Sequence, residues 1–310
     1  MLSGMTKLLV GLGSSRIGPT NTFEIIDLES PLKTCKSLPN FLLELYGSFG
    51  GLEFEDKPII CGGRKGNRDS NKCFSLKGNE WIASSSLNKE NVYAAVSPSP
   101  YPSSDQKLFV TGGMYQNTLH NTVEVLTRQG WKTLPQRLPV EIEAHCSVLV
   151  NSSTVMIIGG YQNGEKSSNT YLFNAENEIW TAGPELKTKR YLHTCVRIRK
   201  NSRSQDFSII VAGGWNRSLT LSSVEILDLG GNEWRKGPDL PIGIDSAKMV
   251  EDPNGGVILV GVSSNSFRNT LYQLPHGGQG AVWTLMSQQL KIKRQTPTAI
   301  LVPDSVVVCS

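Results

Sequence analysis

The sequence predicts an all-β fold, a six-bladed β-propeller in which six four-stranded antiparallel sheets close into a ring. Two observations point to it. Six times along the chain, a run of branched or aromatic apolar residues ends in a glycine pair or its remnant, at residues 13, 63, 113, 160, 214 and 262. Tryptophan recurs in phase with these runs, at Trp81, Trp131, Trp180, Trp234 and Trp283. Two independent markers that share a period of about fifty residues indicate a repeat architecture.

The fifth repeat shows how one blade is predicted to be built. The segment 191–198 (YLHTCVRI) is a short β-branched run, and 206–214 (DFSIIVAGG) is almost wholly apolar, as expected for a strand covered on both faces. The segment 223–229 (SVEILDL) alternates with period two, and EWRKGPDLP gives a short outer strand that ends in a proline-marked loop. One such sheet cannot bury both of its faces alone, so the sheets must stack on one another around an axis.

We expect one domain over residues 1–310, closed by its two ends. The chain begins with a second strand, KLLVGL, whereas TAILV at 298–302 is a first strand with no repeat behind it. Pairing the two removes two open sheet edges, which otherwise invite aggregation. The stretch 305–310 (SVVVCS) has no place in this scheme except as an extra edge strand. The predicted blades are 6–39 with 298–302, 45–86, 92–135, 144–184, 193–240 and 246–288.

Composition narrows the function classes. The chain has 310 residues, 38% of them apolar, and 30 glycines and 16 prolines suit many short strands joined by tight turns. A net charge of +4 without a block of like charges argues against a nucleic-acid partner. The apolar runs are too short to span a bilayer, so we expect no membrane partner, and we expect the propeller to be a monomer.

The repeat resembles the kelch repeat over nearly all of residues 6–302. A glycine pair closes the second strand, an aliphatic or aromatic residue lies in the third, and tryptophan opens the fourth. The end copies depart from this pattern, with GLG at 11–13 and Gly261-Val262 in the last repeat. The resemblance implies that the recurring glycines and tryptophans are structural and pack between blades. These markers are Gly62, Gly63, Trp81, Gly112, Gly113, Trp131, Gly159, Gly160, Trp180, Gly213, Gly214, Trp234 and Trp283.

Sequence signals for catalysis are few. His145 and His193 occupy equivalent first strands, so their periodicity favours a structural role over a metal or catalytic one. No Walker-type phosphate loop, GxSxG or CxxC motif occurs. We therefore expect a non-enzymatic protein without metal or cofactor. The kelch resemblance implies a protein-binding function, such as substrate recognition in ubiquitin-ligase adaptors or actin binding.

The candidate partner surface is the set of loops that join second to third strands. These loops lie on the same face as those that connect one blade to the next, and they mix arginine with large aromatic residues, as binding hot spots do. Their positive excess predicts a protein or peptide partner with an acidic contact segment. The predicted contact residues are Arg64, Arg68, Tyr115, Tyr161, Trp215, Arg217 and Arg268.

Two alternatives to this interpretation stay open. Cys61 and Cys73 fall in one blade, as a disulfide or, the preferred expectation, as two buried thiols in a cytoplasmic protein. Paired cysteines and used glycosylation sequons, at Asn151 and Asn216, would instead indicate a secreted extracellular propeller. The second alternative is a propeller enzyme that oxidises or isomerises a sugar.

Overall fold

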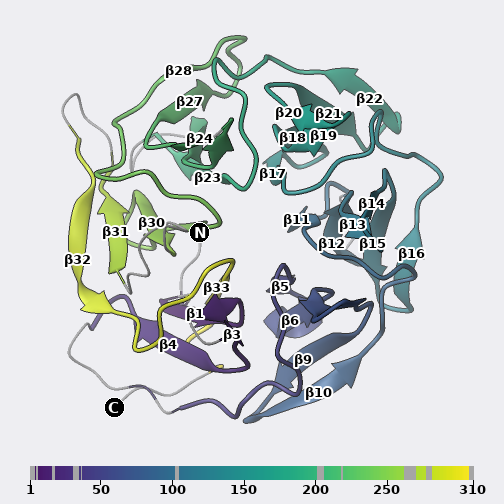
Figure 1. Cartoon of the computed structure of the whole chain (residues 1–310), viewed down its shortest axis with the longest axis vertical. Helices are drawn as coiled ribbons and strands as arrows, with labels where there is room; N and C mark the ends of the chain where they lie inside the picture. The colour runs from purple at the N-terminus through teal and green to yellow at the C-terminus, as the bar shows by residue number, and fades with distance from the viewer. Residues whose placement is uncertain are drawn as a thin grey trace.

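Six β-sheets stand around a common axis in the computed structural model (Figure 1). The structure describes residues 4, 6–15, 18–30, 35, 37–101, 105–200, 206–217, 219–261, 270–276 and 281–306. Within these residues, five sheets have four antiparallel strands and the first has three. Of residues 31–36, where the outer strand of the first blade is expected, only Cys35 is described, and it lies in a β-bridge. The six-bladed propeller predicted from the repeats is confirmed.

Each complete blade runs from an inner strand to an outer strand. Blade two is β5 (Phe49–Leu52), β6 (Pro58–Cys61), β9 (Cys73–Lys77) and β10 (Glu80–Ser84), with a short 3-10 helix at Phe54–Asp56; blade three is β11 (Ala95–Pro98), β12 (Gln106–Thr111), β15 (Val123–Thr127) and β16 (Gly130–Thr133); blade four is β17 (Cys146–Asn151), β18 (Thr154–Ile158), β21 (Thr170–Asn174) and β22 (Ile179–Ala182); blade five is β23 (Thr194–Arg199), β24 (Phe207–Ala212), β27 (Val224–Asp228) and β28 (Arg235–Lys236); blade six is β29 (Lys248–Glu251), β30 (Val257–Val260), β31 (Thr270–Leu274) and β32 (Thr284–Gln289).

The first blade joins the two ends of the chain. Its central strand β1 (Lys7–Gly11) pairs antiparallel with β33 (Thr298–Val302) on one side and with β4 (Phe23–Asp27) on the other. In Figure 1 the yellow β33 lies beside the purple β1. The predicted closure by residues 298–302 is confirmed. Residues 305–306 belong to a turn, and the rest of the expected edge strand, 307–310, lies outside the described residues.

The core consists of six apolar clusters, one at each interface between neighbouring blades. The recurring tryptophans fill these interfaces toward the preceding blade. The Trp81 ring lies 4.8 Å from that of Phe23 in blade one, and the indole N–H of Trp234 donates to the Pro184 carbonyl of blade four at 2.8 Å. Because a single sheet buries only part of its surface, stability depends on these shared interfaces.

The loops that lead from an outer strand to the next inner strand, here the connecting loops, share one unusual backbone position. In every blade the second residue before the inner strand has φ between 49° and 65°, a region that disfavours side chains. The amide of Tyr93 donates to the Gly47 carbonyl at 2.9 Å, and three further links of the same kind continue the chain to Ser246. This arc of hydrogen bonds around the axis holds the strained conformation. The six residues are Gly47, Tyr93, Ala144, Leu192, Ser246 and Thr296.

The second glycine of each pair anchors a connecting loop. The Gly113 amide donates to the Ile142 carbonyl at 2.7 Å, and the Gly160, Gly214 and Gly63 amides make equivalent bonds. Gly113 has φ 107°, and a Cβ there would come within 1.8 Å of the Asn91 side chain. Positive φ and close approach together require glycine at this point of the repeat.

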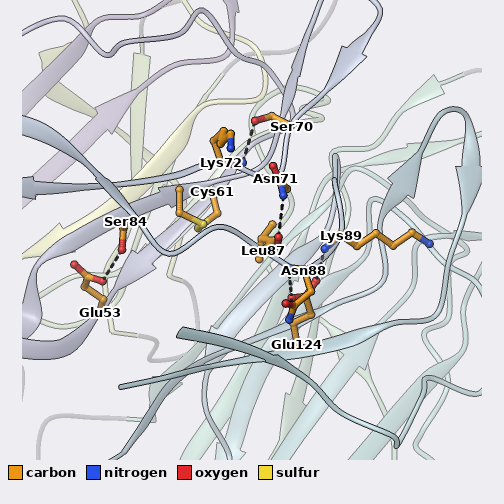
Figure 2. The surroundings of a disulfide bond; sticks show 11 residues. Glu53, Cys61, Ser70, Asn71, Lys72, Ser84, Leu87, Asn88, Lys89 and Glu124 are labelled. Atoms are coloured by element: carbon orange, nitrogen blue, oxygen red, sulfur yellow. Dashed lines mark hydrogen bonds between the residues drawn. A yellow bond between two sulfur atoms is a disulfide. The ribbon is translucent and has the colours of Figure 1, made fainter. Parts of the chain in front are cut away.

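The cysteines are paired, contrary to the expectation of free thiols. Cys61 and Cys73 lie directly opposite each other on β6 and β9, with Cα atoms 4.1 Å apart, and form a disulfide (Figure 2). A second disulfide joins Cys146 and Cys195, on the inner strands of blades four and five. Cys35 is also disulfide-bonded, and the described part of the chain contains no free cysteine. The strand register that makes these pairs is not visible in residue spacing.

Candidate partner-binding face

In the part of the chain that the structure describes, five short hairpins follow the glycine pairs or their remnant. They share one face with the connecting loops, and this face is the hairpin face. The first residue of each hairpin forms a β-bridge to the connecting loop that enters the same blade, as in Tyr46 with Arg64 and Tyr191 with Trp215. The bridges hold loop and hairpin together as one platform. The hairpins are β2 (Ser14–Ser15) with β3 (Gly18–Pro19), β7 (Arg64–Lys65) with β8 (Arg68–Asp69), β13 (Met114–Tyr115) with β14 (Thr118–Leu119), β19 (Tyr161–Gln162) with β20 (Glu165–Lys166), and β25 (Trp215–Asn216) with β26 (Leu219–Thr220).

Arg64, predicted to contact a partner, is already engaged within the protein. Its side chain is 15% exposed, and its guanidinium donates through two nitrogens to Asp69 and through the third to Asn117. Asp69 Oδ2, which accepts from Arg64 Nη2, also accepts the Gln116 amide at 2.8 Å. Burial opposes the charge of Asp69, but the hydrogen bonds from Arg64 and Gln116 lower its pKa below the usual value. Arg64 therefore joins the hairpins of blades two and three, and its charge is compensated.

The other predicted residues fall into two groups. Arg68 and Arg217 are exposed at hairpin tips, and Tyr115 is half-buried beside Glu90. Tyr161 and Trp215 lie nearer the axis, where both meet Tyr191, through a ring distance of 5.9 Å from Tyr161 and through the bridge to Trp215. Arg268 lies outside the described residues.

At the axis the hairpin face is hollowed into a depression of about 470 Å³, here the mouth. Trp215 lines it together with three tyrosines that sequence reasoning missed, Tyr46, Tyr93 and Tyr191. All three are in connecting loops, at the left-handed position or just before it. Their signal in the sequence is this repeat position, two or three residues ahead of the inner strand.

The connecting loops also change the charge of the face. Counting only the hairpins gives a positive excess, but the loops beside them bring Glu44, Glu90, Glu143 and Asp245. Lys65 lies 4.0 Å from Glu44, so part of the hairpin charge is compensated. Arg68 and Arg217 are thus exposed on the hairpins, and exposed lysines such as Lys189 also stand on the connecting loops, whereas Asp245 lines the mouth near the axis.

Beneath the mouth lies a cavity of about 50 Å³ lined by Ser48, His145, His193 and Lys248 among others. Each imidazole is buried and sits against the first glycine of the preceding blade, Gly112 for His145 and Gly159 for His193. His145 Nε2 shares a 2.9 Å hydrogen bond with the Thr111 hydroxyl. Burial lowers the pKa of His145 to about 3 and that of His193 well below its ordinary value, so both are neutral. Among the described residues no group of three His, Cys, Asp or Glu side chains converges.

No helix of the described chain is long and apolar enough to cross a membrane.

The architecture defines the class: a six-bladed β-propeller with a platform of hairpins at one end of its axis. Residues 208–241, which form most of blade five, match the family model described as the kelch motif. A stretch of 113 residues is 29% identical to the cowpox virus protein "Kelch repeat and BTB domain-containing protein 2", covering 36% of this chain and 19% of that relative. The chain is a kelch-repeat β-propeller, an architecture consistent with a non-catalytic protein-binding module.

Proposed function

We propose that this propeller is a non-catalytic module that holds a protein or peptide segment across its hairpin face. The observation that carries the proposal is the mouth, where Trp215 and three tyrosines surround a depression of about 470 Å³. Aromatic side chains supply large contact area with little loss of conformational freedom, and they dominate binding hot spots.

The outer part of the face suits an acidic segment of the partner. Arg68 and Arg217 are exposed at hairpin tips of blades two and five, and neither has an ion pair among the described residues. Exposed charges of this kind accelerate encounter and lose their effect as salt rises, whereas buried aromatic anchors set the dissociation rate.

The cellular role we propose is substrate recognition by a cytoplasmic, monomeric module, as in a ubiquitin-ligase adaptor or an actin-binding protein. The name of the cowpox relative joins kelch repeats to a BTB domain. Such a role needs a domain or separate partner that connects the propeller to the rest of the assembly.

A secreted, extracellular propeller is the second candidate, and the disulfides favour it. Cys61–Cys73 and Cys146–Cys195 are paired, and Asn151 of one sequon is exposed at the end of β17. Alkylation of the native protein without reductant, followed by mass measurement, distinguishes the two. Six modified thiols support the cytoplasmic role, and none supports secretion, because disulfides persist in oxidising compartments.

The binding face is tested with purified partner and three variants. Trp215→Ala should speed dissociation at least about thirtyfold, equivalent to about 2 kcal/mol for a true anchor. Arg68→Glu with Arg217→Glu should slow association and flatten its salt dependence, without a change in melting temperature, because both side chains are exposed. Lys107→Glu is the control, at the start of β12 and away from the hairpins. Binding that is lost with Lys107→Glu and kept with the other variants contradicts the proposal.

A further inference from the structure

Each connecting loop has one residue just before the left-handed position. Five of these six residues form β-bridges to the hairpins, which fix their backbone positions. Two of the six are carboxylates and none is basic. Tyr46, Tyr191, Asp245 and Gln295 line the mouth, Val92 is fully buried, and Glu143 lies beside the lining, in electrostatic contact with Tyr93 and Tyr191.

Tyrosines stand on both sides of Glu143. In ring order it lies between the loop of blade three, which carries Tyr93, and the loop of blade five, which carries Tyr191, and it bridges to Tyr161. The Tyr46 and Tyr93 rings are 6.4 Å apart, and Tyr161 and Tyr191 are 5.9 Å apart. Tyr46, Tyr93 and Tyr191 line the mouth and give it aromatic walls.

The carboxylate of Glu143 is uncompensated. Its Oε2 is buried and has no hydrogen-bond partner among the described residues, and none of the ion pairs found there includes Glu143. The charged and titratable groups around it are Arg64, Tyr93 and Tyr191. The guanidinium of Arg64 is committed to Asp69 and Asn117. Burial raises the pKa of Glu143, with Arg64 only partly offsetting it.

A buried carboxylate without a hydrogen-bond partner raises the free energy of the folded protein. A bound cation that donates hydrogen bonds to the carboxylate removes this penalty. Aromatic faces within about 6 Å attract the same cation through their quadrupoles. An arginine side chain meets both demands, since its planar guanidinium stacks on rings and carries five donors.

We propose that an arginine side chain of the protein partner binds at the edge of the mouth, between the Glu143 carboxylate and the rings of Tyr93 and Tyr191. The proposal rests on the proposed function, that a protein segment docks on the hairpin face, and it names the residue at the centre of that segment. The hairpin face then has two zones, an acidic and aromatic centre and a basic rim around it.

The probe is the capped tripeptide acetyl-Gly-Arg-Gly-amide, titrated into the full chain and followed by the tryptophan fluorescence and tyrosine resonances. Its neutral counterpart, with citrulline in place of arginine, and its glutamate counterpart serve as controls. The arginine peptide should bind about tenfold tighter than the citrulline peptide. Its affinity should rise with pH above the ordinary carboxyl pKa and then level off, because the carboxyl must lose its proton to pair with arginine.

Glu143→Gln should abolish both the preference for arginine and the pH dependence, while Glu141→Gln, an exposed neighbour, should leave them intact. Melting temperatures of both variants report whether the fold is kept. Equal binding of arginine and citrulline, or preference for the glutamate peptide, overturns the proposal. A partner that depends on Trp215 but not on Glu143 overturns this inference alone. A partner that binds independently of Trp215 and the hairpin tips overturns the proposed function as well.

Discussion

Blades one, three and five differ from blades two, four and six at two positions that are otherwise equivalent. The first position, two residues before the left-handed residue of each connecting loop, is buried in all six blades. It is Arg294, Asn91 and Arg190 in the odd blades, and Leu45, Ile142 and Ile244 in the even blades. The second position lies in the third strand, as its second residue in blades one to five and its third residue in blade six. It is Glu24, Glu124 and Glu225 in the odd blades, and Phe74, Tyr171 and Tyr272 in the even blades.

In the odd blades the carboxylate binds the incoming connecting loop. Glu225 accepts the amides of Lys187 and Thr188 at 2.7 and 3.1 Å, together with the Arg190 guanidinium at 2.8 Å. Glu124 likewise accepts the amides of Asn88 and Lys89, as Figure 2 shows.

In the even blades an aromatic ring replaces this network. Phe74 packs edge-on against Phe41 at 5.1 Å, and Tyr272 shares an apolar cluster with Ile244. One backbone plan therefore accepts either a hydrogen-bonded polar set or an apolar set. Each set is consistent only within itself, because a half-satisfied polar set is worse than either.

The largest effect expected is loss of the closed ring. The ring closes where blade six, an even blade, meets blade one, an odd blade. Removal of residues 296–310 deletes β33 and leaves β1 with an unpaired edge. We expect no soluble expression, or a sharp fall in the thermal unfolding midpoint. A truncated protein that melts with the full chain would show that closure is dispensable.

The recurring tryptophans test whether their contribution to stability depends on burial alone and not on the odd–even alternation. Trp234 is completely buried and Trp180 partly, so Trp234→Ala should cost close to 5 kcal/mol and Trp180→Ala about 3 kcal/mol, by denaturant unfolding. If all five tryptophans are changed to alanine, the loss of stability should rank by burial. A ranking by odd and even blades would instead mean that the alternation extends to the tryptophan position.

Converting an odd blade into an even one tests the comparison directly. Arg190→Ile should destabilise by about 4 kcal/mol, since it leaves Glu225 buried without its cation. The double variant Arg190→Ile with Glu225→Tyr copies Ile142 and Tyr171 of blade four and should recover much of that loss. Additive losses in the double-mutant cycle would mean that the two positions do not act as a set.

The smallest effect concerns the mouth, where no interface is disturbed. Burial raises the pKa of Glu143, so the folded state keeps its proton where the unfolded state has released it. Stability then falls as pH rises from the ordinary carboxyl pKa through the raised one. Glu143→Gln should remove this fall and stabilise the protein at neutral pH by about 1 kcal/mol. Identical pH–stability curves for variant and parent would rule out an uncompensated carboxylate.

The odd–even alternation is present in the sequence. The third strands read FEI, VEV and VEI in odd repeats, and CFS, TYL and LYQ in even ones. Aligning the repeats by glycine pairs reveals the difference, but not that its partner is a connecting-loop residue about 35 positions away, as with Glu225 and Arg190. That pairing follows from the order of blades around the axis.

The sequence by itself determined the propeller, its six blades, their strands and the closing strand. These depend on local properties, namely apolar runs, alternation of period two, and glycine where φ is positive, and each recurs with the repeat. Only the tertiary structure decided the composition of the mouth, because Tyr46, Tyr93, Tyr191 and Trp215 come from three repeats and meet only when the blades stand around one axis. It likewise decided the cysteine pairs and the compensation of Arg64, since strand register and side-chain approach set both.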